Sequence, residues 1–182
     1  MTRETVCVSR RTLLGWVASG AAAWALPAAL RAATVGERSL AFVHTHTGES
    51  GRITYWAEGD YLADGLAALR RLLRDHYSGD EHAIDVQLLD CLHRVHATLD
   101  TTEPFHVISG YRSPETNAAL AARSGGIAQR SLHMLGQAID VRIPGRSLAS
   151  LRDSALALRA GGVGYYAGPD FVHIDVGRVR RW

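Results

Sequence analysis

The stretch SLHMLGQAIDVRI, residues 131–143, decides the fold because it joins a turn to a strand of unusual composition. Its second half, AIDVRI, is rich in the apolar and β-branched residues that favour strands, and the Pro-Gly pair after it predicts the turn that ends the strand. Gly136 permits the chain to turn between His133 and the strand. Asp140 is the exception, since a carboxylate between apolar neighbours in a strand needs a partner.

The stretch FVHIDVG, residues 171–177, has the same combination of apolar and ionisable residues. Side chains alternate between the two faces of a strand, so Phe171, His173 and Asp175 share one face and the aliphatic residues between them share the other. The aliphatic face predicts a core contact. The face with His173 and Asp175 then points away from the core, where these side chains are available for a site.

The rest of the chain mixes helical and strand patterns without a regular strand–helix–strand alternation. Ser113 and Pro114 predict a helix start, Ser147 predicts another, and glycine pairs follow both helices. This order favours an α+β fold over a doubly wound one. We expect strands at 40–44, 52–56, 105–110, 139–143, 163–166 and 171–176, and helices at 61–76, 84–99, 113–123 and 147–159.

The N-terminal segment predicts an export signal. Arg10 and Arg11 precede an uncharged apolar run over residues 13–29, which resembles a twin-arginine (Tat) signal peptide. Two glycines and Pro27 interrupt the run, which is shorter than the roughly 20 residues that a membrane span needs. We expect a signal peptide over residues 1–33 and a single domain over 34–182, although Arg31 near the cleavage site leaves a retained anchor open.

Composition excludes several classes of chemistry. All 20 basic residues are arginine, which excludes lysine Schiff bases and a Walker-type phosphate loop. Residues 1–33 hold four arginines and one glutamate, so the formal net charge of +2 becomes −1 for the remainder, and no basic stripe suggests nucleic acid. Cys91 is the one cysteine after the signal and is expected to be buried packing. Any metal ligands must therefore be His, Asp or Glu.

His133, Asp140 and His173 are the candidate metal ligands. Three such ligands leave the fourth tetrahedral position to water, which is the open arrangement of a catalytic zinc site. Spacing alone also fits histidines that are simply hydrogen-bonded and partly buried. His44 and His46 lie two apart without a carboxylate at strand spacing, so we interpret them as surface or substrate-groove residues.

Several motifs together resemble a known family. The pattern Ser-x-His-x-x-Gly-x-Ala-x-Asp at 131–140, followed by a late His, resembles the zinc signature of the D-Ala-D-Ala metallopeptidase and hedgehog superfamily. SGYRSPETN at 109–117, AGGVGYY at 160–166, FVHIDVG at 171–177, the final Arg-Trp and the twin-arginine leader resemble the MepK (YcbK-like) murein endopeptidase family. The similarity covers nearly the whole chain, with its motifs in the same order.

This resemblance implies a small antiparallel sheet with flanking helices and one zinc ion per chain, on His133, Asp140 and His173. It implies hydrolysis of peptidoglycan crosslinks between two diaminopimelate residues, between D-Ala and diaminopimelate, or both. We expect the exported chain to act in the periplasm as a monomer. The partners would be peptidoglycan stem peptides and the Tat export machinery. The alternatives are a D,D-carboxypeptidase or dipeptidase acting on wall peptides, and a non-catalytic zinc module that binds peptidoglycan.

The resemblance also suggests groups for catalysis. Related peptidases carry an acidic residue three positions before the last His ligand, a position that Asp170 holds here. Asp175 is the rival for proton transfer, and it could instead accept a hydrogen bond from a metal-bound His. Arg112 matches a position that assists the substrate carbonyl in related dipeptidases, and its fork suits a carboxylate or an oxyanion. A surface arginine is the plain alternative.

Overall fold

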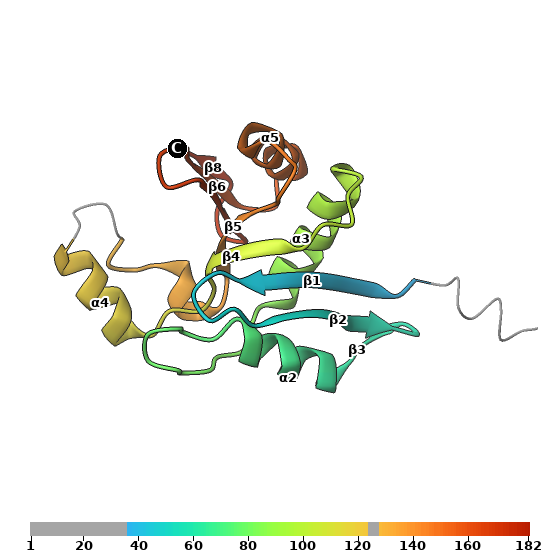
Figure 1. Cartoon of the computed structure of the whole chain (residues 1–182), viewed down its shortest axis with the longest axis horizontal. Coiled ribbons are helices and arrows are strands. Elements are labelled where there is room, and N and C mark those ends of the chain that lie inside the picture. The colour runs from blue at the N-terminus through green and yellow to red at the C-terminus, as the bar shows by residue number, and fades with distance from the viewer. Residues whose placement is uncertain (1–35, 124–127) are drawn as a thin grey trace, which may run out of the picture.

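The computed structural model describes residues 36–123 and 128–182 of the chain (Figure 1). The signal peptide expected over residues 1–33 lies outside these described residues. Within them, no helix is both long enough and apolar enough to cross a membrane.

A single mixed sheet of eight strands organises the structure, in the order β3-β2-β1-β4-β5-β7-β6-β8. Neighbouring strands are antiparallel except for β1 with β4 and β6 with β8, which are parallel. The α+β class expected from the sequence is confirmed, but the sheet is larger than expected and not purely antiparallel. The strands are β1 (Arg38–His44), β2 (Ser50–Ala57), β3 (Asp60–Tyr61), β4 (Phe105–Ser109), β5 (Ala138–Arg142), β6 (Gly162–Tyr166), β7 (Phe171–Asp175) and β8 (Arg180–Arg181).

Four α-helices and one 3-10 helix accompany the sheet among the described residues: α2 (Ala63–Leu72), α3 (Val86–Thr98), α4 (Pro114–Arg123), α5 (Leu148–Leu158) and η1 (Leu132–Leu135). The Asp85 carboxylate accepts a hydrogen bond from the Gln87 amide and so begins α3, and Ser147 caps α5 in the same way through Ser150. The helix expected over 61–76 is shorter than predicted, because Tyr61 pairs with Trp56 in the sheet and Leu62 is extended.

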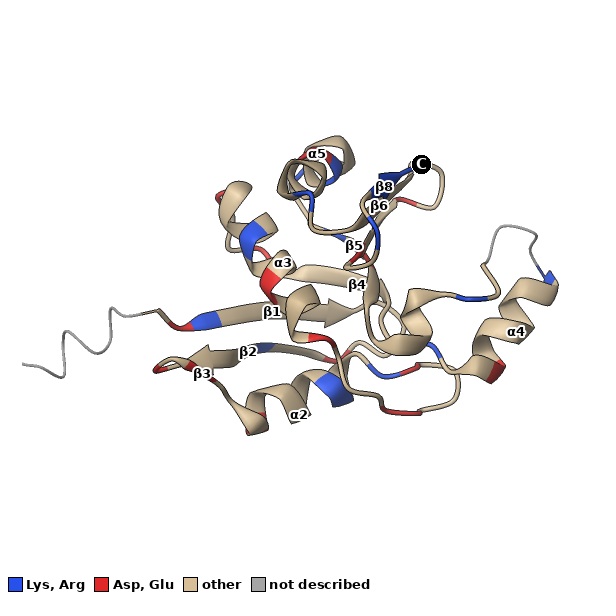
Figure 2. Ribbon diagram, turned by 180° about the vertical axis from the view of Figure 1, so that it is seen from behind, with Lys and Arg blue, Asp and Glu red and all other residues tan. Residues whose placement is uncertain are grey.

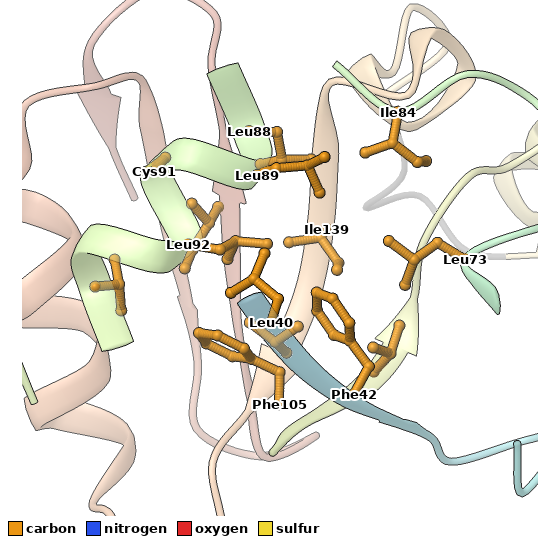
Figure 3. Packing of buried hydrophobic residues seen from close by; sticks show 14 of the residues in the cluster. Leu40, Phe42, Leu73, Ile84, Leu88, Leu89, Cys91, Leu92, Phe105 and Ile139 are labelled. Atoms are coloured by element: carbon orange, nitrogen blue, oxygen red, sulfur yellow. The ribbon is translucent and has the colours of Figure 1, made fainter. Parts of the chain in front are cut away.

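The main core lies between α3 and the centre of the sheet (Figure 3). Leu88, Leu89 and Leu92 are buried along one side of α3, as the helical period predicts. They meet side chains of β1, β4 and β5, among them Phe105 and Ile139, which are each at most 1% exposed. The core thus holds one face of the central strands, and this contact fixes the direction of their other face.

In the view of Figure 2, arginine and acidic residues are interspersed along the ribbon of the described residues. This mixture agrees with the near-neutral formal charge of residues 34–182.

Candidate metal centre

Asp140 and His173 lie side by side because β5 and β7 are neighbours and these two residues are opposite each other in the register. Their strand neighbours Ile139 and Ile174 are also opposite each other and are each 1% exposed in the core. The alternation of a strand then turns Asp140 and His173 to the other face of the sheet. His173 Nδ1 lies 2.8 Å from Asp140 Oδ1.

His133 reaches the same point from η1, the turn that precedes β5. Ser131 begins η1, since its hydroxyl accepts a hydrogen bond from the His133 amide at 3.4 Å. Gly136 ends it in the left-handed conformation, with φ of 64°, and a Cβ there would collide with the Ala83 carbonyl. Gly136 therefore allows the turn that the sequence predicted.

Three atoms with free lone pairs converge at the centre: one nitrogen of each histidine ring and one oxygen of Asp140. His133 Nδ1 lies 2.7 Å from the Gly110 carbonyl oxygen, and His173 Nε2 lies 3.1 Å from Asp175 Oδ2, so each of these ring nitrogens carries the proton that it donates. The other nitrogens, His133 Nε2 and His173 Nδ1, are 3.2 Å apart, and His133 Nε2 is 3.3 Å from Asp140 Oδ1. Lone pairs placed so closely need a positive charge between them, and a metal ion supplies one.

The pKa shifts of Asp140 and His173 also show that this position favours a positive charge. Burial alone would raise the pKa of Asp140, but the adjacent His133 and His173 outweigh it and hold this pKa well below its ordinary value. Burial alone would lower the pKa of His173, but hydrogen bonds with Asp140 and Asp175 raise it to about 8. The position between these three side chains therefore suits a positive charge, either a proton or a metal ion. Among the described residues, this is the group of three whose ligand atoms are close enough to hold a metal ion.

Asp175 is a buried acceptor behind His173, and its side chain is 0% exposed. Its Oδ1 accepts hydrogen bonds from the Gly162 and Gly177 amides, both at 2.9 Å. Arg180 donates to both of its oxygens, at 3.1 and 2.7 Å. Burial opposes ionisation, yet these donors hold the pKa of Asp175 well below its ordinary value. Asp175 is thus a fixed negative charge that sets the tautomer of His173.

Arg112 is 9% exposed and lies on the other side of Asp140. Its guanidinium is 3.5 Å from Asp140 Oδ2, donates to the Ser109 hydroxyl at 3.1 Å and to the Asn117 side-chain oxygen at 3.4 Å. Its Nε is buried without a hydrogen-bond partner. Arg112 is therefore a buried residue of the site, and the alternative of a surface arginine does not apply.

The centre lies in a cleft of about 540 Å³. The walls carry cationic and aromatic groups, and Asp140 has the one acidic side chain among the described residues that line the cleft. Besides the three candidate ligands, the residues that line the cleft include His46, His76, Arg112, Arg130, Arg180 and Trp182. The rings of His46 and His76 are stacked, with centroids 4.1 Å apart.

Comparison with known proteins identifies the family. A sequence model described as peptidoglycan L,D-endopeptidase MepK matches residues 32–182. The chain is 44% identical over 176 residues to the peptidoglycan L,D-endopeptidase MepK of Escherichia coli K12, covering 96% of this chain and 97% of that protein. The chain belongs to the MepK family. The probable peptidoglycan L,D-endopeptidase MepK of Haemophilus influenzae is 39% identical over 148 residues, which cover 80% of this chain and 78% of that one.

Membership of the MepK family confirms the resemblance seen in the sequence motifs and places the chain among peptidases. The structure brings together the three predicted ligands, with Arg112 and Asp175 on either side of them.

Asp170, expected as the proton acceptor, lies elsewhere. Its carboxylate pairs with Arg142 at 3.2 Å, its side chain is 62% exposed, and it is not among the residues that line the cleft. Asp170 has a φ of 59° in the turn between β6 and β7, where an aspartate is ordinary turn chemistry. This placement does not favour a role in proton transfer.

The sequence interpretation of His44 and His46 as surface or substrate-groove residues is right for one of them, and it missed other cleft residues. His46 lines the cleft, as a groove residue should, whereas His44 is 0% exposed and so does not lie on the surface. Its Nδ1 accepts a hydrogen bond from the His46 amide at 3.3 Å and so shapes the hairpin loop. His76 and Arg180 belong to the cleft through contacts with distant residues, and no local pattern marks them.

Proposed function

We propose that this chain is a zinc-dependent endopeptidase that cleaves peptide crosslinks of peptidoglycan. The observation that carries the proposal is the convergence of His133 Nε2, Asp140 Oδ1 and His173 Nδ1 on one point of a cleft, in a member of the MepK family. We extend to this chain the L,D bond type that its relatives' names specify. The L,D bond type corresponds to the diaminopimelate–diaminopimelate link. The D-Ala–diaminopimelate link, whose carbonyl belongs to a D residue, would be a second, D,D substrate bond.

The donor set suits one zinc ion per chain, since two imidazole nitrogens and a carboxylate oxygen leave a fourth position open. When bound, zinc would lower the pKa of its water toward about 7 and polarise the scissile carbonyl. The chain's own part is to hold both imidazoles as neutral ligands. The Gly110 carbonyl does this for His133 and the Asp175 carboxylate does it for His173.

We assign Arg112 to the binding of the substrate carbonyl or of a nearby carboxylate, because it is a fixed cation beside Asp140 on the wall of the cleft. Proton transfer needs a group within reach of the substrate. Both carboxylate oxygens of Asp175 already accept hydrogen bonds, which fits a role in orienting the His173 ring. Apart from the ligands, His46 and His76 are the described cleft residues with an imidazole side chain, a group that serves as a general base in many enzymes.

We also propose that residues 1–33 direct export through the Tat machinery, and that residues 34–182 act as a monomer in the periplasm. The support is the Arg10-Arg11 pair before an apolar run, together with a family match that begins at residue 32.

The test is to incubate the purified protein with crosslinked muropeptides, with and without a chelator, and to follow the products by mass spectrometry. We expect separated stem peptides only when metal is present. Asp140→Asn should abolish cleavage, and Asp153→Asn on exposed α5 is the matched control that should retain it.

Unchanged crosslinked dimers with zinc-loaded protein would refute the proposal. Release of D-Ala or a dipeptide would identify the carboxypeptidase or dipeptidase alternative. Binding of stem peptides without cleavage would identify a non-catalytic zinc module.

A further inference from the structure

Residues 180–182 are fixed to the edge of the sheet beside the metal centre. β8 pairs with β6 in parallel, with Arg180 opposite Gly162. The pairing continues into Trp182, whose amide donates to the Val163 carbonyl at 3.3 Å and whose carbonyl accepts from the Tyr165 amide at 3.0 Å. Arg180 and Trp182 both line the cleft.

Arg180 is connected to His173 through a single carboxylate. Its NH2 group donates to Asp175 Oδ2 at 2.7 Å, and the same oxygen accepts from His173 Nε2 at 3.1 Å. Its NH1 group donates to Asp175 Oδ1 at 3.1 Å. A two-pronged arginine–carboxylate contact fixes the carboxylate in both position and rotation. The orientation of the His173 ring therefore depends on Arg180.

Trp182 in turn restrains Arg180. The guanidinium carbon lies 4.9 Å from the centre of the indole ring, a cation–π contact. The indole nitrogen donates to the Tyr166 hydroxyl at 2.7 Å, and the indole lies 5.3 Å from the His173 ring, centroid to centroid. Gly164 leaves the space for this ring, because a Cβ there would be 2.6 Å from the Trp182 Cε2 atom.

We propose that Arg180 and Trp182 are positioning residues of the metal centre, which act on His173 through Asp175. The proposal rests on the proposed function in that His173 is taken as a metal ligand. Arg180 reaches His173 through the Asp175 carboxylate, and Trp182 lies against Arg180 and the His173 ring, so their effect is on the geometry of a ligand.

The expected loss of zinc affinity depends on how many contacts separate each residue from the metal ligand His173. Loss of a direct hydrogen-bond partner of a metal ligand costs roughly 10- to 100-fold in metal affinity. Arg180 is one contact further away, so Arg180→Ala should weaken zinc binding by about 10-fold, the lower end of that range. Arg180→Lys keeps the charge but not the two-pronged contact, so it should recover only part of the loss.

The experiment measures zinc affinity by competition with a chromophoric chelator, and the thermal unfolding of each metal-free protein. The variants are Arg180→Ala, Arg180→Lys, Trp182→Phe and Trp182→Ala. Arg181→Ala is the matched control, since Arg181 is the same residue type in the same strand with an exposed side chain. We expect zinc affinity in the order wild type and Arg181→Ala, then Arg180→Lys, then Arg180→Ala, with Trp182→Phe above Trp182→Ala.

A merely structural role would lower the melting temperature of the metal-free variants without changing the zinc affinity of the folded fraction, and that result would overturn the proposal. If Arg180→Ala fails to fold, the milder Arg180→Lys and Trp182→Phe variants test the proposal instead. Wild-type zinc affinity in both of these variants would refute the proposal. Failure of the proposed function is a separate result. In that case the wild type would bind zinc and leave crosslinked muropeptides intact, while the order of affinities would still hold.

Discussion

Replacing Asp75 with asparagine tests the contact that holds the Arg112 loop against the segment after α2. Asp75 is 1% exposed. One carboxylate oxygen accepts from the Ser113 amide and the other from the Tyr77 amide, both at 2.9 Å. Ser113 follows Arg112 directly and Tyr77 lines the cleft, so a single buried carboxylate joins two parts of the cleft wall.

The expected loss of folding stability can be calculated from the pKa of Asp75. Burial alone would raise the pKa of Asp75, but hydrogen bonds from Thr116, Ser113 and Tyr77 outweigh it and lower the pKa from 3.8 to about 2. A difference of this size between unfolded and folded chains corresponds to about 2 kcal/mol of stability at neutral pH. Because the folded pKa is the lower one, this contribution is complete above about pH 4 and disappears as the pH falls through about 2.

Urea unfolding of the wild type and of Asp75→Asn at pH 7, 4 and 3 measures the effect. We expect the variant to lose about 2 kcal/mol at pH 7 and 4, and the difference to shrink at pH 3. Asp153→Asn, on the exposed side of α5, is the control and should change stability by less than about 0.5 kcal/mol. An Asp75→Asn protein as stable as the control at pH 7, or a loss that does not shrink at pH 3, would show that the reasoning is wrong.

Three other predictions concern single residues. Asp170→Asn should leave cleavage within about twofold of wild type, since an exposed surface ion pair contributes little; loss of turnover with zinc still bound would restore Asp170 as the proton acceptor. Gly164→Ala should cost about 1–3 kcal/mol and displace the Trp182 indole, and an unchanged tryptophan emission spectrum would contradict the displacement. Burial raises the pKa of Cys91 to about 11, so a thiol reagent at pH 8 should label it only after unfolding; rapid labelling of the native protein would exclude this burial.

The sequence predicted those parts of the site that depend on local periodicity. The alternation in AIDVRI and FVHIDVG places Asp140 and His173 opposite the core face of their strands, and Gly136 marks the turn that brings in His133. Most helices and strands begin and end within a few residues of the expected positions, because caps, glycines and prolines are local signals as well.

Contacts between distant segments were not predictable in this way. The parallel pairing of β1 with β4 joins strands about 60 residues apart, and no local pattern encodes it. The same holds for the stacking of His46 on His76 from two separate loops. Asp170 and Asp175 are equally plausible on spacing alone. Only the fold shows that one carboxylate faces solvent beside Arg142 while the other is buried behind His173.

The central strands have two roles at once, since Ile139 and Ile174 pack in the core while their neighbours Asp140 and His173 form the floor of the cleft. Part of the cleft wall comes instead from loops, among them the β1–β2 hairpin loop with His46. A change in the floor would disturb the packing of the whole sheet, whereas the hairpin loop can vary with little effect on it. Attempts to redirect such an enzyme to a different crosslink should therefore diversify the hairpin loop and leave the strands alone.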